Sequence, residues 1–320
     1  MVFERPDKVK YLTECGCPLC KVNKIRLRYP IDREYLYKHT NISFNGVSIG
    51  VAECTGCGHQ FIYPCPSKEL LFLFYRSYMS SARNGFYESR TGEVIPDDFR
   101  NYYGPWIDRI RNLVDVESPR LLDVGCGLGM FLRLAREKGF QVNGIEPNAE
   151  AVAWLENKYA IKSHNTLLED YSGDEQYDVI TMWDLLEHLA QPVRAVEKIH
   201  SMLAKGGLLV LEIPVRDSLL HWLAKGLYRF SAGKIKRPLF LVCGFHHLQY
   251  FSEKSVISFL EDQGFEVVYA ERAETNLGAL RKKKGGIKSL VHNQALYGIF
   301  SMAKLLRRQN KLVIVARKHG

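Results

Sequence analysis

The chain has 320 residues, of which 46% are hydrophobic and 25% charged, proportions that are ordinary for a soluble globular protein. This length suffices for one sizeable core with a smaller module, or for two domains. Residues 1–10 carry several charges and no apolar core, and no apolar run approaches the roughly 18 residues that a membrane-spanning helix requires. The sequence therefore predicts neither a secretory signal nor a membrane span, and a cytoplasmic location is expected.

The net charge of +9 is concentrated near the carboxyl terminus. Residues 275–320 contain eleven Lys and Arg and no acid, whereas the other 274 residues hold 33 basic and 35 acidic side chains. An anionic partner is therefore expected for this segment rather than for the whole surface.

Four cysteines form two C-x-x-C pairs, Cys17 with Cys20 and Cys54 with Cys57. Two such pairs offer four thiolates at the corners of a tetrahedron, which predicts a structural zinc ion. Free thiols or a redox pair are the alternative, and Cys15 is a second candidate for the place of Cys17.

The segment between the two pairs contains candidate strands at Tyr35–Tyr37 and Val47–Val51. The other cysteines, Cys65, Cys126 and Cys243, are isolated in the sequence and are expected to be small packed side chains. Residues 1–66 are thus predicted to form a zinc-binding module.

Residues 67–118 form a connector rich in aromatic side chains. The sequence predicts a helix over Asp97–Val114. Most of these rings are expected to pack the two modules together, and one or two near Tyr102 are candidates to close over a bound cofactor.

Strands and helices alternate after Pro119. The predicted strands are Arg120–Val124, Gln141–Ile145, Tyr177–Met182, Leu208–Ile213, Phe265–Tyr269 and Leu312–Ala316. The predicted helices are Met130–Lys138, Ala149–Tyr159, Pro192–Leu203, Ser252–Gln263 and part of Ile287–Arg308. Continuously apolar strands alternating with helices are typical of an α/β doubly wound, mostly parallel sheet, which binds ligands at the carboxyl ends of its strands.

The first of these strands runs into a glycine loop, with the sequence LLDVGCGLGMFL over Leu121–Leu132. Gly125, Gly127 and Gly129 let the backbone adopt conformations that a Cβ forbids and approach a ligand closely. The helix that starts beyond the loop offers unpaired N–H groups. The loop is therefore predicted to bind a cofactor.

Two acids narrow the choice of cofactor. Glu146 follows the second strand, where a carboxylate accepts hydrogen bonds from two ribose hydroxyls, so an adenosine-containing cofactor is implied. Asp123 precedes the first glycine, where it would repel a pyrophosphate but could receive the ammonium of a methionine moiety. The glycine spacing also differs from the G-x-G-x-x-G of dinucleotide sites, so S-adenosylmethionine is favoured over a nicotinamide dinucleotide.

Residues 120–270 resemble class I S-adenosylmethionine-dependent methyltransferases. The motifs that carry the resemblance occur in the family's order: LLDVGCGLGMFL, VNGIEPN, YDVITMWDLLEHLAQP, LAKGGLLVLEIP and FSEKSVISFLEDQGFEVV. The resemblance implies a seven-stranded Rossmann-like sheet over residues 119–320 whose last strand is antiparallel, a place that NKLVIVARK fits.

The resemblance also implies a set of cofactor-binding residues. Asp123, Gly125 and Gly127 would hold the methionine part and Glu146 the ribose. Thr166 and Leu167 would lie near the adenine, and Trp183 and Asp184 would line the site. The remaining residues of the predicted set are Gly129 and Pro147.

The amino-terminal segment is similar to the zinc-binding, zinc-ribbon-like region that precedes some methyltransferases of nucleotide-linked sugars and polysaccharide precursors. Such sugar C-methyltransferases carry a segment with a tyrosine, a glutamate and a histidine where this chain has GFHHLQYFS. His247 matches the histidine, but His246 stands in place of the glutamate and no tyrosine matches. The mismatch counts against C-methylation and leaves O-methylation open.

Three histidines and Asp184 are the candidates for acid–base work on the acceptor. His188 follows the fourth strand, where it either contacts the acceptor or braces a helix. His246 and His247 precede the helix that begins near Ser252, and a turn histidine bonded to backbone is the alternative for His247.

An insertion over residues 215–250 is predicted to form a lid over the acceptor. It contains Lys234, Lys236 and Arg237, which suit the phosphate of a sugar nucleotide or lipid-linked saccharide, or simply form a solvated basic surface.

Residues 276–309 form a basic amphipathic segment, and residues 281–308 suit contact with an anionic membrane surface. Packing on the chain's own core, or on a second copy in a homodimer, is the alternative. The apolar residues are Ile287, Leu290, Val291, Ile299, Met302, Leu305 and Leu306.

The leading hypothesis is methylation of an anionic, phosphate-bearing saccharide or precursor. The alternatives are O-methylation of a quinone-type lipid precursor, methylation of nucleic acid, and a binding module that has lost activity. Methyltransferases of base amino groups typically carry an Asn/Asp-Pro-Pro-aromatic stretch where this chain has MWDLLEH, so a nucleic-acid partner is disfavoured. The intact Asp123, glycine loop and Glu146 count against the inactive module.

Overall fold

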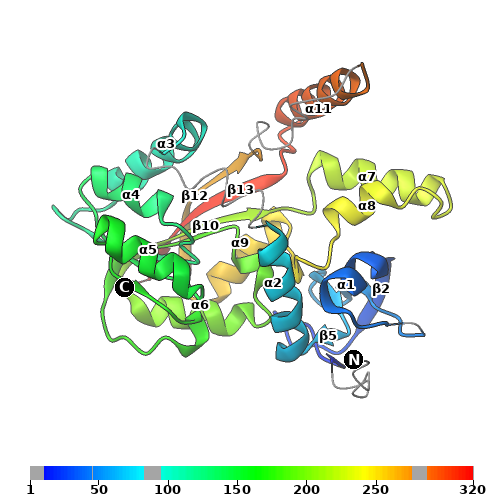
Figure 1. Ribbon diagram of the computed structural model, residues 1–320, viewed down its shortest axis with the longest axis horizontal. Coiled ribbons are helices and arrows are strands. Elements are labelled where there is room, and N and C mark those ends of the chain that lie inside the picture. The colour runs from blue at the N-terminus through cyan, green and yellow to red at the C-terminus, as the bar shows by residue number, and fades with distance from the viewer. Residues whose placement is uncertain (1–10, 45, 83–94, 276–286, 320) are drawn as a thin grey trace.

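The structure of the protein is a computed structural model that describes residues 11–44, 46–82, 95–275 and 287–319 (Figure 1). Its largest element is a seven-stranded sheet with the order β12-β13-β10-β9-β6-β7-β8. The strands are β6 (Arg120–Val124), β7 (Gln141–Ile145), β8 (Ser163–His164), β9 (Tyr177–Trp183), β10 (Leu203–Pro214), β12 (Phe265–Ala273) and β13 (Lys311–Lys318). Only β13 runs antiparallel to its neighbours in this sheet. The predicted sheet, including its antiparallel last strand, is confirmed.

Helices cover both faces of the sheet and enclose two hydrophobic cores. One face carries α3 (Asp97–Leu113), α4 (Met130–Glu137) and α5 (Ala149–Tyr159). The other carries α6 (Pro192–Met202) and α9 (Glu253–Asp262). Because both faces are covered, the central strands are almost continuously apolar rather than alternating.

The strand order places a switch point beside β6. The chain runs from β6 outward to β7 and β8, and then crosses to β9 on the other side of β6. The loops that follow β6 and β9 therefore diverge at the carboxyl ends of these strands, which is where open α/β sheets bind ligands.

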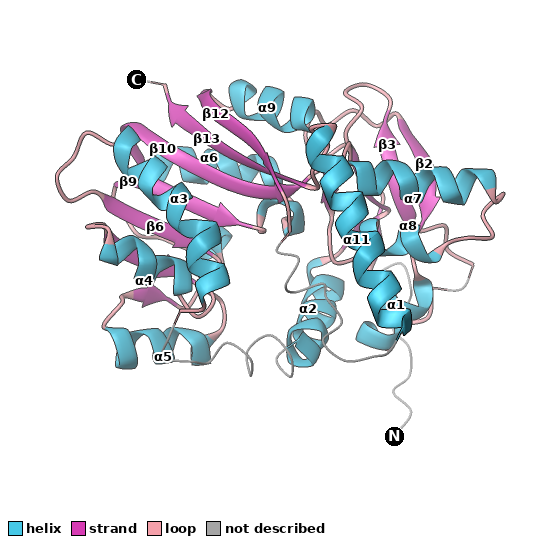
Figure 2. Ribbon diagram, turned by 90° about the horizontal axis from the view of Figure 1, so that it is seen from above, coloured by secondary structure: helices cyan, strands magenta, loops and turns pink. Residues whose placement is uncertain are grey.

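A second, four-stranded sheet has the order β11-β4-β3-β2 and lies beside the first (Figure 2). Three of its strands come from the amino-terminal segment: β2 (Ile25–Pro30), β3 (Gly50–Cys54) and β4 (Gln60–Tyr63). The fourth, β11 (Gln249–Tyr250), comes from the end of the predicted insertion and pairs with β4. The amino-terminal segment and the insertion therefore share one sheet.

The same two segments share one hydrophobic core. Buried side chains of α1 (Arg33–Thr40) and α2 (Lys68–Ala82) pack with residues from α8 (Arg237–Val242) and the segment after it. Leu36 and Phe74 on the amino-terminal side lie in one cluster with Leu239 and Phe245. The insertion also contributes α7 (Leu219–Phe230), which the sequence pattern indicated.

The predicted strand at Tyr35–Tyr37 is wrong, because these residues lie within the helix α1. Asp32 caps this helix by accepting hydrogen bonds from the N–H groups of Glu34 and Tyr35. The second predicted strand, Val47–Val51, is shifted, since β3 begins only at Gly50. The aromatic and β-branched residues suggested strands, but a capping aspartate at the start overrides that propensity.

Cys65 is not isolated, because it forms a disulfide with Cys15, with the two Cα atoms 6.0 Å apart. The disulfide lies beside the short ladder of β1 (Leu12–Thr13) and β5 (Cys65–Pro66). Cys15 is thereby removed as a metal ligand in place of Cys17. Cys126 and Cys243 are buried free thiols, as expected for packed side chains.

The carboxyl-terminal helix α11 (Ile287–Leu305) lies against α7. Phe300 and Ala303 are buried, whereas Met302, Leu305 and Leu306 are exposed. The predicted apolar residues Ile287, Leu290 and Val291 lie outside the residues whose side chains are described. Among the described helices, none has the length and apolar character needed to cross a membrane.

Candidate active site

The glycine loop between β6 and α4 adopts left-handed backbone conformations. Gly127 has a φ of +52°, and a Cβ placed on it would meet no heavy atom within 4 Å, so open space adjoins the loop at this point. Gly129 has a φ of +62°, and a Cβ there would lie 2.4 Å from Cδ2 of Leu155 in α5. The last glycine thus permits close helix packing, and Gly127 leaves room for a ligand.

Glu146, directly after β7, faces this loop. Its Oε2 accepts a hydrogen bond from the N–H of Gly127 at 2.9 Å, and its Oε1 accepts one from Asn148 at 2.9 Å. Burial raises the pKa of Glu146, and these two hydrogen bonds act in the opposite direction. Pro147 separates Glu146 from Asn148, whose side chain caps α5. The carboxylate is thereby fixed at the edge of the open space.

Asp123, the fourth residue of β6, is buried beside the same loop. Its Oδ1 accepts a hydrogen bond from the hydroxyl of Thr181 at 2.6 Å. Burial raises the pKa of Asp123 to about 7; the Thr181 hydroxyl lowers it, and the negative charge of Glu146 raises it. An Asp in this setting stabilises a cation placed next to it.

Thr166 and Leu167 follow β8 and lie beside Glu146. The amide of Asn165 donates a hydrogen bond to the backbone oxygen of Glu146 at 3.3 Å, which fixes this loop against β7. Thr166 is half-buried and Leu167 is 51% exposed. An exposed Leu next to a buried carboxylate suits a flat apolar group such as an adenine.

Trp183 ends β9 and packs between two other rings. Its ring centroid lies 5.0 Å from that of Tyr103 and 4.8 Å from that of Phe131. The indole Nε1 is buried and has no hydrogen-bond partner among the described residues. An orphaned donor at the carboxyl end of a central strand points to a ligand that completes the site.

Asp184 follows with a φ of +50°, which is uncommon for a residue other than glycine. Its carboxylate pairs with Lys311 of β13, which also pairs with the fully buried Glu212 of β10. The hydroxyl of Tyr102 donates to the other oxygen of Glu212 at 2.5 Å. Backbone strain held in place by buried charges is common at functional sites.

Sequence reasoning missed Lys311 and Glu212. Both lie in segments quoted above, Glu212 in LAKGGLLVLEIP and Lys311 in NKLVIVARK. The available signal was a charged residue inside or beside an apolar run, Glu212 within Leu208–Ile213 and Lys311 directly before Leu312–Ala316, since such groups are buried only when paired. Rings near Tyr102 were candidates to close over a bound cofactor, and the hydroxyl of Tyr102 donates to Glu212.

The three candidate histidines, His188, His246 and His247, lie together and are called the histidine cluster below. The ring centroids of His246 and His247 are 4.2 Å apart, and those of His188 and His247 are 4.9 Å apart. Burial lowers the pKa of each of these imidazoles, to about 4 for His246. All three are therefore neutral at pH 7, which is the form that accepts a proton or binds a metal.

The glycine loop, Asp123, Glu146, Trp183 and the histidine cluster fall within one family match. A family described as "Methyltransferase domain" matches residues 98–270, more than half of the chain. The chain belongs to this methyltransferase family. Its sheet order and antiparallel last strand are those of the class I S-adenosylmethionine-dependent members.

Curated relatives of the methyltransferase domain have low sequence identity. The ubiquinone biosynthesis O-methyltransferase of Nitrobacter winogradskyi is 28% identical over 139 residues, 38% of this chain and 53% of the relative. The protein of the same name from Pseudomonas syringae pv. tomato is 31% identical over 109 residues, covering 32% and 46% of the two chains. The chain thus spans about half the length of the curated relatives it matches.

Solved structures give a distant likeness. An S-adenosylmethionine-dependent methyltransferase from Archaeoglobus fulgidus superposes with a TM-score of 0.47 at 18% identity, covering 75% of this chain and 99% of the other. A second such methyltransferase, from Mesorhizobium loti, superposes with a TM-score of 0.44 at 17% identity, covering 68% of this chain and 97% of the other.

The amino-terminal side of the methyltransferase domain carries the predicted cysteine cluster. The Sγ atoms of Cys17, Cys20, Cys54 and Cys57 all lie within 4.8 Å of one another, and two pairs are 3.6 and 3.5 Å apart. Sulfurs on a tetrahedral zinc with bonds of about 2.3 Å are separated by about 3.8 Å. The four thiols are therefore arranged as zinc ligands, and their chemistry fits that ion.

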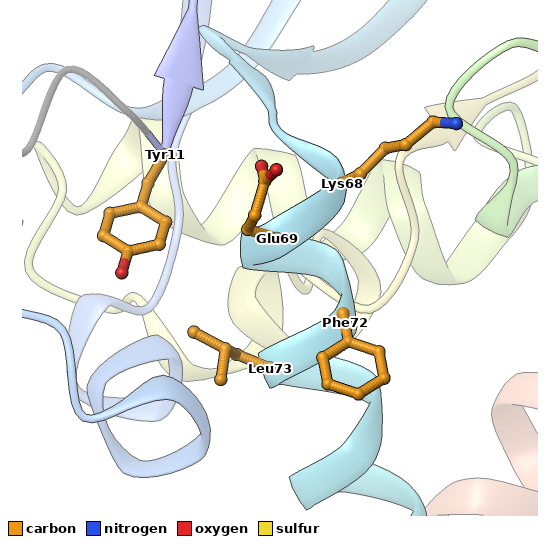
Figure 3. Close-up of a pocket in the computed structure, with 5 residues that line it drawn as sticks. All are labelled: Tyr11, Lys68, Glu69, Phe72 and Leu73. Carbon is orange, nitrogen blue, oxygen red and sulfur yellow. The ribbon is translucent and has the colours of Figure 1, made fainter.

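A surface hollow of about 390 Å³ lies elsewhere, between β1 and α2 (Figure 3). Its lining residues are Tyr11, Lys68, Glu69, Phe72 and Leu73. None of them belongs to the glycine loop, the ends of β7 and β9, or the histidine cluster. We assign this hollow no part in the methyltransferase site.

Proposed function

We propose that this protein is an enzyme that transfers the methyl group of S-adenosylmethionine to a hydroxyl group of a small molecule. The observation that carries the proposal is the pair of buried acids, Asp123 and Glu146, at the open space beside Gly127. The carboxylate of Asp123 would repel a pyrophosphate, whereas the two carboxylates together suit a ligand that combines an ammonium group with a ribose.

In the proposed complex, each residue of the donor site has one task. Glu146 accepts hydrogen bonds from the ribose hydroxyls, and Asp123 compensates the ammonium of the methionine moiety. Trp183 and the loop with Leu167 bound the site on the β9 and β8 sides. When bound, S-adenosylmethionine supplies a methyl carbon activated by the positive charge of its sulfonium. The protein then has to align an acceptor oxygen with that carbon, and alignment contributes up to about 7–11 kcal/mol.

The acceptor hydroxyl also has to lose its proton. The histidine cluster offers neutral imidazoles at His188, four residues beyond Asp184, and on the segment that precedes β11. The amino-terminal segment and the insertion surround this side, because β11 pairs with β4. We therefore propose that the acceptor binds between the donor site and the histidine cluster.

We propose a phosphate-bearing sugar nucleotide or polysaccharide precursor as the acceptor. Two observations support this class: the resemblance of the amino-terminal segment to that of sugar methyltransferases, and the exposed Lys234, Lys236 and Arg237 just before and at the start of α8. Cations on an exposed lid bind phosphate oxygens by charge-assisted hydrogen bonds.

A quinone-type lipid precursor is the second candidate, and the names of the curated relatives favour it. An exposed apolar surface on α7 and α11 supports it as well. Phe230 is 96% exposed, Trp222 64% and Leu305 83%, and Arg229, Arg307 and Arg308 stand nearby in the sequence. Apolar side chains rimmed by cations suit the surface of an anionic membrane.

We also propose that the cysteine cluster holds a structural zinc ion. Cys54 ends β3, and the Cys57 side of the cluster continues through Gly58 into β4. A closed four-thiolate site contributes folding energy and takes no part in chemistry. The ion would stabilise the sheet to which β11 belongs.

Calorimetry tests the cofactor. S-adenosylmethionine and its demethylated product are titrated into the wild-type chain and into Glu146→Ala, with a nicotinamide dinucleotide as the control ligand. Hydrogen bonds to a charged group contribute about 1.5–3 kcal/mol, so Glu146→Ala is expected to weaken binding about 10–100-fold. Glu150→Ala, an exposed acid in the first turn of α5, is the matched control and should bind like the wild type. Binding of the dinucleotide alone would refute the proposal.

The acceptor is then sought with a labelled methyl group. Transfer to sugar nucleotides supports the first candidate, and transfer to a polyprenyl phenol supports the second. Sedimentation with phosphatidylglycerol vesicles, compared with phosphatidylcholine vesicles, tests the membrane surface. Phe230→Ser should reduce sedimentation with the anionic vesicles, and equal sedimentation of both proteins would contradict the proposed contact.

A further inference from the structure

A buried carboxylate stands beside the histidine cluster without a hydrogen-bond partner. Glu187 lies in the short helix η4 (Leu186–His188), and its side chain is 1% exposed. Neither of its carboxylate oxygens has a hydrogen-bond partner in the part of the chain that the structure describes. A buried carboxylate is ordinarily paired or bound to a metal, so Glu187 calls for a cationic ligand.

Two imidazoles face this carboxylate through the same ring nitrogen. The Nε2 of His188 lies 3.7 Å from Oε1 of Glu187, and the Nε2 of His247 lies 3.9 Å from the same oxygen. These three ligand atoms all lie within 4.8 Å of one another.

The hydrogen bonds of His188 fix which of its nitrogens is free. Its Nδ1 lies 2.5 Å from the backbone oxygen of His246. A carbonyl oxygen only accepts, so Nδ1 carries the proton and Nε2 presents a lone pair toward Glu187. The hydroxyl of Tyr75 donates to the same carbonyl at 3.0 Å and braces the arrangement. An imidazole held at Nδ1 by a carbonyl, with Nε2 free, is the usual arrangement of a metal-binding histidine.

We propose that Glu187, His188 and His247 bind a divalent first-row transition-metal ion, such as Zn²⁺ or Mn²⁺. Two neutral imidazoles and one carboxylate form the ligand set that such ions accept, and the set contains no thiolate. The ion neutralises the charge of the buried Glu187 carboxylate. The carboxylate faces the lone pair of an imidazole nitrogen rather than a hydrogen-bond donor, so an ion between them satisfies both groups.

The spacing of the ligand atoms supports this assignment. Ligands bound at 2.0–2.1 Å around a tetrahedral ion are separated by about 3.4 Å. The two measured distances, 3.7 and 3.9 Å, approach that value and close with small side-chain rotations. The His188 and His247 side chains are 22% and 21% exposed, so one side of the site is accessible to a further ligand.

The position of the site suggests its use. Glu187 follows Asp184 by three residues, and the side chain of Leu185 between them occupies the space that a Cβ at Gly125 would enter. If the proposed methyl transfer is correct, the ion lies on the acceptor side, where it would bind the acceptor oxygen and favour loss of the hydroxyl proton. His188 and His247 then serve as ligands of the ion, so the proton passes to His246 or to solvent rather than to them. This use depends on the proposed function, whereas the metal site itself does not.

Titration with Co²⁺ tests the site in the full chain, purified with the ion of its cysteine cluster in place. Cobalt bound by nitrogen and oxygen gives visible absorption without the ultraviolet charge-transfer band of thiolate ligands. We expect one Co²⁺ per chain with this spectrum. Glu187→Gln and His247→Ala should each weaken binding by more than the roughly 10–100-fold that loss of a supporting hydrogen bond causes. Tyr75→Phe, which removes such a bond, should weaken it within that range.

His200→Ala, a histidine of α6 outside the cluster, is the matched control and should bind Co²⁺ like the wild type. Circular dichroism and a thiol count confirm that each variant retains its fold and its cysteine cluster. Lack of Co²⁺ binding by the wild type, or binding that Glu187→Gln and His247→Ala both leave unchanged, would overturn the inference. A chain that binds S-adenosylmethionine but not Co²⁺ overturns the metal site alone, and the converse overturns the proposed cofactor alone.

Discussion

Asp123 is expected to make the stability of the unliganded protein depend on pH. The carboxylate is 3% exposed, and burial raises its pKa from 3.8 to about 7. The substitution Asp123→Asn keeps the shape of the side chain and an oxygen that accepts from the hydroxyl of Thr181. The amide does not titrate, so the comparison of the two proteins isolates the proton of Asp123.

The size and sign of the effect follow from proton linkage. Each pKa unit corresponds to about 1.4 kcal/mol, so a shift from 3.8 to about 7 corresponds to about 4 kcal/mol. Between these pH values the folded protein holds a proton on Asp123 that the unfolded chain has lost. The free energy of unfolding therefore falls as the pH rises from about 4 to about 7, and levels off above. Asp123→Asn lacks this decrease and should gain stability over the wild type by up to about 4 kcal/mol across the range.

Urea unfolding at a series of pH values from about 4 to about 8 measures this difference. Calorimetry on the same samples gives the second readout. A cationic ammonium favours the ionised carboxylate, so the affinity of the wild type for S-adenosylmethionine should rise up to about pH 7, with proton release on binding. Asp123→Asn should bind more weakly and without that pH dependence.

A second variant makes the reasoning refutable. Thr181→Val removes the hydrogen bond that favours the ionised carboxylate, so it should move the pH transition upward. If the stability difference between the wild type and Asp123→Asn were the same at every pH, Asp123 would be ionised in the free protein. The argument from its burial would then be wrong.

Two further sets of substitutions test the supports of the proposed donor site. Lys311→Met leaves the carboxylate of Glu212 buried without its cation, and urea unfolding should show a loss of about 3–5 kcal/mol, most of which Glu212→Gln in the same chain should restore. Gly127→Ala and Gly129→Ala both place a Cβ on a left-handed backbone, which should lower the free energy of unfolding by about 1–2 kcal/mol in each case. Only the Cβ of Gly129→Ala also collides with Leu155. Gly129→Ala should therefore lose about 1–3 kcal/mol more in the unfolding assay, and equal losses would show that the packing argument is mistaken.

The part of the fold that carries the glycine loop, Asp123 and Glu146 could be predicted from the sequence because its signals are local. The strands Arg120–Val124 and Gln141–Ile145 and the helix Ala149–Tyr159 were predicted with the bounds that the structure has. Each is an apolar run or a period of 3.6 residues bounded by glycine, proline or a capping asparagine. The proximity of Asp123 and Glu146 follows from adjacent parallel strands that end at the same edge.

The part of the fold around Lys311, η4 and the histidine cluster depends on contacts between residues that are distant in the sequence. Such contacts carry no local signal. Lys311 meets Asp184 across 127 positions, and β11 pairs with β4 across nearly 190. Glu187 was passed over in favour of His188 because the sequence does not tell a buried carboxylate from one that faces water. The disulfide between Cys15 and Cys65 was missed since neither cysteine belongs to a motif.

The contacts around Leu248 explain how the amino-terminal segment reaches the chemistry. The N–H of Ile62 in β4 donates to the oxygen of Leu248 at 3.0 Å, and the N–H of Leu248 donates to the oxygen of Glu187 at 2.8 Å. The side-chain amide of Gln249 donates to the oxygen of Leu189 at 2.9 Å, so this segment holds the middle residue of η4 and the residue that follows the helix. The sheet stabilised by the cysteine cluster therefore positions the backbone of the histidine cluster, whereas the donor site is held by the seven-stranded sheet. The family match begins at residue 98, so the strands β2, β3 and β4 lie outside it. If the acceptor binds beside the histidine cluster, as proposed, we expect the choice of acceptor to depend on these strands.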